Sequence, residues 1–203
     1  MYKIAITALL VIFGLGVFVF VVSSMGETVD TTIDNSISMP IATNTPPEEI
    51  PASVIPDSWE RYELTNLGVT FPYSPKMEVS KNDDGSVRFV LFGPSQSRGT
   101  EMYDGIILTF SHGVSESTLK QYVDSLASQQ SDDIYMETTP VTTILVNKRL
   151  SYKYAVSSLG TFTYIFVPLK DNSYLSISYL LEDPKDQGFR EVLNTILSNV
   201  VIK

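Results

Sequence analysis

The chain contains no cysteine and a single histidine among its 203 residues. The lack of cysteine excludes disulfides, metal–thiolate sites and thiol nucleophiles. Any imidazole base, Ser-His-Asp triad or histidine metal ligand would have to use His112. Its neighbour Ser111 shares a predicted strand, where successive side chains point to opposite faces, so the two are poorly placed to share a proton. A hydrolase built on His112 is therefore the least favoured of three functional hypotheses.

Positive charge is also scarce, because 14 lysine and arginine residues face 23 acids and leave a net charge of −9. Binding to nucleic acid or to anionic lipid calls for clustered basic residues, so neither partner is expected. The one basic cluster, Lys148, Arg149 and Lys153, alternates with apolar residues along a predicted strand. That spacing is typical of a solvated strand face.

Motifs that carry chemistry are missing as well. Asp83-Asp84-Gly85 lacks the regular acid spacing and the terminal glutamate of a calcium loop, and it predicts a turn. The glycines at 93, 99 and 105 are too scattered to cradle a phosphate. We therefore predict no catalytic, cofactor-binding or metal-binding residue, no cofactor and no enzymatic activity.

What the chain does have is one long hydrophobic run, Ile4–Val22, after Lys3. At a rise of about 1.5 Å per residue, nineteen helical residues roughly cross a hydrocarbon core of about 30 Å. Residues 4–24 are accordingly predicted to be a single transmembrane anchor, with residues 1–3 in the cytoplasm. Lys3 favours a cytoplasmic N-terminus and an exported C-terminal domain. The alternative is a secretory signal cleaved near Ser24, although its apolar region would be unusually long.

Residues 25–57 are predicted to be an acidic linker. The segment is rich in Pro, Thr and Ser, has no aromatic residue and carries six acids without a lysine or arginine. Its isolated apolar residues follow neither a helical nor a strand period. A flexible chain of this length spans on the order of 30 Å, which suits a tether.

Residues 58–203 are predicted to form one extracytoplasmic α+β domain with a mostly antiparallel sheet. Short strands are expected up to Ser111, followed by a helix whose apolar residues run from Leu119 to Ala127, capped by Ser115 or Ser117. Three more strands should follow over 141–154, 161–169 and 174–181, the first of them bent near Asn147. Asp183-Pro184 is expected to open a C-terminal helix, and 200–202 to form a closing strand.

The segment Leu67-Gly-Val-Thr-Phe-Pro-Tyr-Ser-Pro-Lys-Met-Glu-Val79 resembles the opening motif of PsbP-like domains, which are related to the photosystem II extrinsic protein. The order of hairpins, middle helix, three-stranded meander and final helix is also similar, so the resemblance covers residues 58–203. It implies a PsbP-like sandwich and a habit of assisting larger assemblies. It implies no catalytic residues and does not extend to a role in photosystem II.

Surface residues are the remaining functional candidates. The loop 93–104 is the longest interruption of the predicted domain and contains Arg98, Met102 and Tyr103. Tyr152 and Tyr154 belong to a set of tyrosines on the last strands, which either pack between sheet and helix or form an aromatic binding face. These five residues form the candidate binding surface.

The sequence thus favours a non-enzymatic, membrane-anchored domain that binds a protein partner, most simply a complex of the bacterial cell envelope. The alternative is a domain that binds a small molecule or glycan in a pocket between sheet and helix.

Overall fold

The computed structural model describes residues 9–13, 16–20, 46–97 and 99–203, and the chain divides into two compact units, 1–43 and 44–203. In the first unit, β1 (Leu9–Phe13) and β2 (Gly16–Phe20) pair as an antiparallel hairpin. Residues 4–8, 14–15 and 21–24 of the predicted anchor lie outside the described residues, as do 25–45 of the predicted linker and Arg98. No helix in the described ranges is long and apolar enough to cross a membrane. The anchor therefore stays a prediction.

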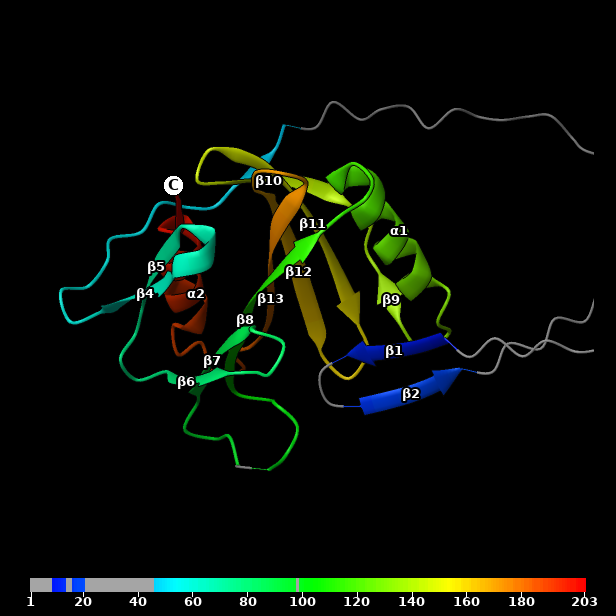
Figure 1. Cartoon of the computed structure of the whole chain (residues 1–203). Coiled ribbons are helices and arrows are strands. Elements are labelled where there is room, and N and C mark those ends of the chain that lie inside the picture. Colours follow the sequence, from blue (N-terminus) through cyan, green and yellow to red (C-terminus); the bar gives the residue numbers. More distant parts are fainter. Residues whose placement is uncertain (1–8, 14–15, 21–45, 98) are drawn as a thin grey trace, which may run out of the picture. The chain divides into compact units, whose positions relative to one another are not determined.

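The second unit is built around a 9-stranded sheet in the order β3-β10-β11-β12-β13-β8-β7-β6, with β9 paired to β11 (Figure 1). Its strands are β3 (Glu48–Glu49), β6 (Glu78–Lys81), β7 (Val87–Phe92), β8 (Gly105–Val114), β9 (Glu137–Thr138), β10 (Thr142–Val146), β11 (Arg149–Ser157), β12 (Thr161–Pro168) and β13 (Ser173–Glu182). All of these pairings are antiparallel except that of β3 with β10. The predicted α+β class with a mostly antiparallel sheet and two helices is thereby confirmed.

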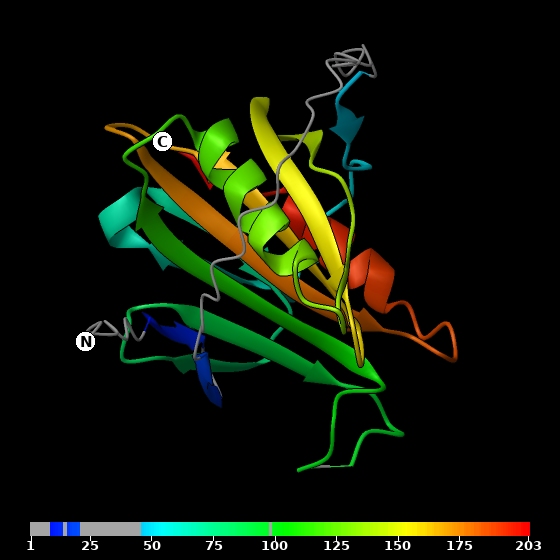
Figure 2. The same ribbon diagram turned by 90° about the vertical axis from the view of Figure 1, so that its right-hand side faces the viewer.

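One face of this sheet is covered by helix α2 (Phe189–Ser198) and a 3-stranded sheet of β4 (Glu60–Leu64), β5 (Val69–Tyr73) and β14 (Val201–Ile202). A short 3-10 helix, η1 (Thr65–Leu67), joins β4 to β5. Helix α1 (Leu119–Ser131) lies on the opposite face, so that the sheet is the middle layer in both views (Figures 1 and 2).

The larger core fills the layer beneath α2, and alternation along the strands explains its composition. Leu108 and Phe110 of β8 point into it and are fully buried, as is Phe89 of β7. Phe71 of β5 stacks on Phe110 with ring centroids 3.9 Å apart. This contact joins the small sheet to the large one.

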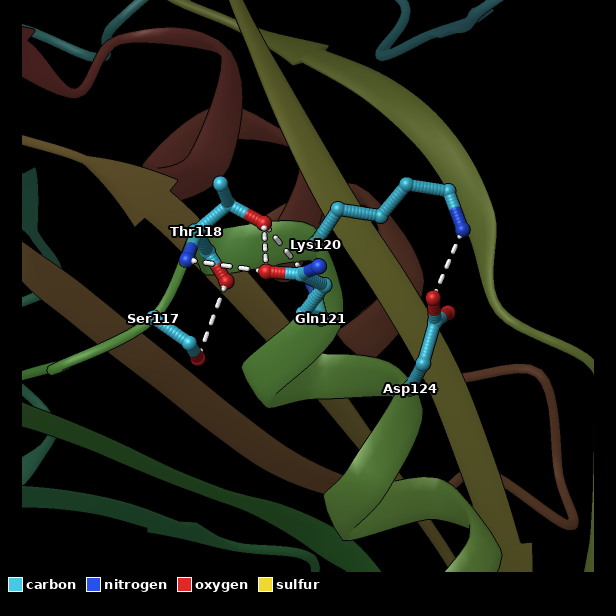
Figure 3. A network of polar contacts seen from close by, with 5 residues as sticks. All are labelled: Ser117, Thr118, Lys120, Gln121 and Asp124. Atoms are coloured by element: carbon cyan, nitrogen blue, oxygen red, sulfur yellow. Dashed lines mark hydrogen bonds and ion pairs between the residues drawn. The ribbon is translucent and has the colours of Figure 1, made fainter.

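Helix α1 begins at a capping box, and its N-cap lies three residues after Ser115 and one residue after Ser117, the two predicted N-cap positions. The N-cap is Thr118, whose Oγ1 accepts from Gln121 N (3.4 Å), while Gln121 Oε1 accepts from Thr118 N and Oγ1 (Figure 3). Ser115 and Ser117 form the preceding turn instead, with Ser117 N donating to Ser115 Oγ. Lys120 and Asp124 form an ion pair one turn along the helix, 2.7 Å apart. A threonine followed three residues later by glutamine was the available signal.

Helix α2 begins later than predicted. Its N-cap is Gly188 in the left-handed region (φ 85°), and Asp183 lies in the preceding turn. The Asp183 carboxylate accepts from Gln187 N at 2.6 Å and from Phe189 N at 3.0 Å. Asp183 thus satisfies a backbone donor of the first helical turn from outside the helix.

The predicted bent strand over 141–154 is two strands, β10 and β11. Asn147 and Lys148 turn the chain with φ of 48° and 61°. Two consecutive left-handed residues are the geometry of a type I′ hairpin turn, for which asparagine at the first position is favoured.

Residues 46–57, part of the predicted linker, contact the domain. β3 pairs with β10, and Glu48 forms an ion pair with Lys153 of β11. Ile50 packs on the larger core, and Asn199 Nδ2 donates to Ser53 O at 3.0 Å. The folded unit therefore includes residues upstream of the predicted boundary at 57.

Candidate interaction surface

The loop 93–104 between β7 and β8 is held in shape by the side chain of Gln96. Its Nε2 donates to three loop oxygens, on Ser97, Thr100 and Glu101, at 2.9, 3.0 and 3.1 Å. Its Oε1 accepts from the backbone nitrogens of Tyr103 (2.9 Å) and Asp104 (3.2 Å). One amide side chain thereby replaces the ladder hydrogen bonds that a loop lacks.

Asp104 fastens this loop to the start of α2. Its side chain is fully buried, accepts from Ser95 N at 2.8 Å and accepts from Gln187 Nε2 at 2.7 Å. Gly93 allows the approach, since a Cβ there would lie 2.1 Å from Asp104 Oδ1. Lys185 Nζ also donates to Ser95 Oγ at 2.6 Å. The loop and the segment 183–188 therefore form one ordered surface.

Exposed apolar side chains gather at the end of the large sheet where the loop 93–104 and the segment 183–188 lie. The register places the ends of the strands together there: Gly105 lies opposite Phe92 and Glu182, and Phe162 lies opposite Leu180 and Val156. The exposed apolar residues on these ends and their connections are Phe92, Tyr103, Ile134, Tyr135, Met136, Leu159 and Phe162. We call these seven residues the apolar end. Ile134 and Leu159 are each 87% exposed and Tyr135 is 81% exposed, which is unusual for side chains of this size.

The apolar end has an acidic border. Besides Asp104 and Asp183, whose carboxylates accept hydrogen bonds from neighbouring residues, the acids on the same connections and strand ends are Glu101, Asp132, Asp133, Glu137, Glu182 and Asp186. Among the described residues of these connections, Lys185 is the basic one, and its Nζ donates to Ser95 Oγ. A partner that fits this surface would carry apolar side chains surrounded by positive charge.

Of the five predicted surface residues, Arg98 lies outside the described residues, and the other four do not form one exposed surface. Tyr103 is 43% exposed and donates through its hydroxyl to Ser95 O, and Met102 beside it is half-buried. Tyr152 is half-buried and Tyr154 is only 2% exposed, both against α1. Tyr154 is thus corrected from the surface to the core, because α1 packs across β11 and β12 and covers it. The sequence analysis did not single out Ile134–Met136 or Leu159, which lie in connections between the predicted elements.

The tyrosines under α1 form the second core. Tyr174 donates to Tyr122 Oη at 2.9 Å, and Tyr154 stacks on Tyr164 with centroids 5.2 Å apart. Burial raises the pKa of Tyr154, Tyr164 and Tyr174 above the ordinary value of 10.0. These phenols therefore stay neutral and fill the space between helix and sheet.

Two open hollows are present on the described surface. One of about 410 Å³ lies beside α1 and is lined by Asp124, Ala127, Ser128, Ser131 and residues 138–141. The other, of about 340 Å³, lies between Lys76, Glu78, Gln96 and residues 90–92. The first hollow is bounded by α1 and by Thr138 of β9, so it lies between a helix and the sheet, where the alternative hypothesis places a ligand pocket.

His112 lies exposed on β8 opposite Leu175, and Ser111 is opposite Ser176 on the other face of the strand. Within the described ranges, no group of three or more histidine, aspartate and glutamate side chains is arranged to hold a metal ion.

Neither a scan against protein-family models nor a search of curated proteins gave a significant match. Among solved structures, cyanobacterial PsbP (CyanoP) from Synechocystis sp. PCC 6803 is similar at 13% identity and a TM-score of 0.47, over 75% of this chain and 96% of that one. A protein from Bacteroides thetaiotaomicron is similar at 7% identity and a TM-score of 0.44, over 72% of this chain but only 49% of its own length. The first of these is a PsbP, the family that residues 67–79 resemble, and the likeness concerns the arrangement of the chain alone.

Proposed function

We propose that this protein is a non-enzymatic, membrane-anchored extracytoplasmic domain that binds a protein partner of the cell envelope through the apolar end. The supporting observation is the grouping of exposed apolar side chains. Of the twelve large exposed hydrophobic residues in the described ranges, seven belong to the apolar end. Scattered single residues of this kind need no explanation, whereas a group rimmed by polar residues is typical of an interaction site.

The order of the surface adds to this proposal. Gln96 and Asp104 hold the described residues of the loop 93–104, which are 93–97 and 99–104, in place in the free protein. A surface that is already ordered loses less conformational entropy on binding than a mobile one. The acidic border would steer a basic partner and disfavour acidic ones.

The direction of the chain is also consistent with the proposal. β3, the first strand of the folded unit, lies at the top of the domain, and the loop 93–104 lies at the bottom (Figures 1 and 2). If the preceding residues are a tether, the apolar end is the part of the domain furthest from its attachment.

The test is crosslinking and affinity purification of the full-length protein from its native membranes. We expect a stoichiometric partner that the fragment 44–203 displaces. The fragment carrying Tyr135→Ser and Leu159→Ser should fail to compete, because both changes remove exposed apolar area without touching the core. The matched control carries Val54→Ser and Val114→Ser, which are 91% and 64% exposed elsewhere, and should compete as the wild type does.

Recovery of the protein alone would contradict the proposal. Equal competition by both double variants would leave a partner in place but would show that the apolar end is not its binding surface.

A further inference from the structure

The sheet face that carries α1 is only half covered. α1 packs over β11 and β12, while the part of the same face over β8, β7 and β6 carries no helix in the described ranges (Figure 2). Alternation identifies the side chains on this open half. Leu108 and Phe110 point into the core beneath α2, so Thr109 and Ser111 point to the α1 side.

Small hydroxyl side chains line this open half in two neighbouring rows. The register places Ser80, Arg88, Thr109 and Ser178 side by side across four strands. In the next row, Ser111 lies opposite Ser176. Directly opposite residues in a sheet have Cβ atoms about 5 Å apart, so the hydroxyls adjoin one another and the arginine.

Arg88 is the exception in this arrangement. It is half-buried, and its Nε is buried without a hydrogen-bond acceptor among the residues that the structure describes. The ion pairs of the described second unit, Lys120–Asp124, Lys153–Glu48 and Lys203–Glu63, do not include it. Native structures rarely leave a buried charged donor unsatisfied, and a bound ion is one of the usual reasons.

Arg149 provides a comparison within the same sheet. It is also half-buried on a strand, but its Nη1 donates to Pro168 O at 3.2 Å. The fold can therefore supply an acceptor to a half-buried arginine, whereas the described residues supply none to Arg88 Nε.

The charged groups around Arg88 leave its row free of carboxylates. Glu78, on the same face of β6, lies opposite Val90 and thus one row away. In the turn between β6 and β7, Asp84 accepts from Ser86 N at 2.8 Å. Lys81 lies opposite Val87, which points to the other face.

We propose that Arg88 and the adjacent hydroxyls of Ser80, Thr109 and Ser178 form a binding site for an oxyanion, the carboxylate or phosphate of a hydroxyl-rich ligand such as an acidic sugar. The planar guanidinium matches two oxygens of such a group. The serine and threonine hydroxyls both donate and accept, so they can pair with the oxyanion and with neighbouring ligand hydroxyls. This site is independent of the apolar end and of whatever partner binds there.

The experiment is an NMR titration of full-length protein in detergent at constant ionic strength, with inorganic phosphate, galacturonate and uncharged galactose as probes. We expect saturable shifts of the Arg88, Thr109 and Ser178 amides with the two anions and weaker or no shifts with galactose. If galacturonate binds more tightly than phosphate, the rows of hydroxyl side chains contact the sugar ring. If the two bind equally, the site recognises the oxyanion alone.

Arg88→Gln should weaken anion binding about tenfold or more, because it removes the charge-assisted pair. Arg88→Lys keeps the charge and should bind with intermediate affinity, which guards against loss of folding in the glutamine variant. Arg190→Gln, an exposed arginine on α2, is the matched control and should bind as the wild type does. Shifts that do not saturate, or that persist unchanged in Arg88→Gln, would mean an adventitious ion only and would overturn the proposal.

Discussion

At the residue scale, two polar side chains determine the conformation of the loop 93–104. Gln96 makes its hydrogen bonds within the loop. Asp104 accepts one hydrogen bond from Ser95 in the loop and one from Gln187, which lies outside the loop. Neither role is readable from the sequence. The partners of Gln96 are local but follow no recognised motif, and the contact of Asp104 with Gln187 exists only because the fold brings these distant residues to 2.7 Å. Arg88 differs, because it is the single charged residue in the otherwise apolar run Val87–Phe92 and is therefore visible in the sequence as an exception to the strand pattern.

Asp104→Ala should destabilise the domain by about 1–3 kcal/mol, because it leaves the half-buried Ser95 N–H and the Gln187 amide without their acceptor. Urea denaturation followed by circular dichroism measures this change. Glu101→Ala, an exposed acid of the same loop, should leave the free energy of unfolding unchanged. A stable Asp104→Ala variant would show that the loop does not depend on this carboxylate.

At the scale of elements, alternation and helical periodicity identified most strands and both helices, and the errors fell at their ends. The strand predicted over 161–169 is β12 at Thr161–Pro168, whereas α2 begins at Phe189 rather than beside Pro184. Side-chain contacts decide where a helix begins. Asp183, five residues before the N-cap Gly188, accepts a hydrogen bond from Phe189 N in the first turn of α2. The hairpin at Asn147 was missed because its two-residue turn lacks the glycine that usually marks one.

Lys148→Gly tests this turn. Lys148 has a φ of 61°, which costs a residue with a side chain about 1–2 kcal/mol and costs glycine almost nothing. After the larger backbone entropy of glycine in the unfolded chain is subtracted, we expect a gain in stability of about 0.5 kcal/mol. The urea midpoint should therefore rise. Lys170 also lies in a hairpin but is not in the left-handed region, so the urea midpoint of Lys170→Gly should fall.

At the scale of the whole molecule, the domain has two cores of different character on the two faces of one sheet. The core beneath α2 is mainly aliphatic with stacked phenylalanines, and the core beneath α1 is rich in tyrosine. The sequence predicted the sheet and the helices, and it left open whether the tyrosines pack between them or form a binding face. It could not predict which strand ends meet, and therefore it could not assemble the apolar end from three separate segments.

The tyrosine core makes stability depend on pH in the alkaline range. Burial, then the neighbouring Tyr164 and Tyr122, raises the pKa of Tyr154 above 10.0, whereas the unfolded chain titrates near that value. The stabilising contribution of the neutral phenol is therefore complete below pH 10 and is lost as the pH rises above it.

Between pH 8 and pH 11, Tyr154→Phe should consequently lose less unfolding free energy than the wild type, as measured by urea denaturation at each pH. Tyr135→Phe, an exposed tyrosine, is the control and should follow the wild type. Equal losses in all three proteins would mean that Tyr154 does not contribute to the alkaline transition.

The two-residue strand β3 has a mechanical consequence. It joins the folded unit through its pairing with β10 and the ion pair between Glu48 and Lys153, both close to the point where the chain enters the domain. A pulling force transmitted from the residues before 46 acts on these contacts first. Their release would lengthen the free chain while the aromatic contact of Phe71 with Phe110 stays intact. It would also uncover the edge of β10, which could then pair with a strand from another chain.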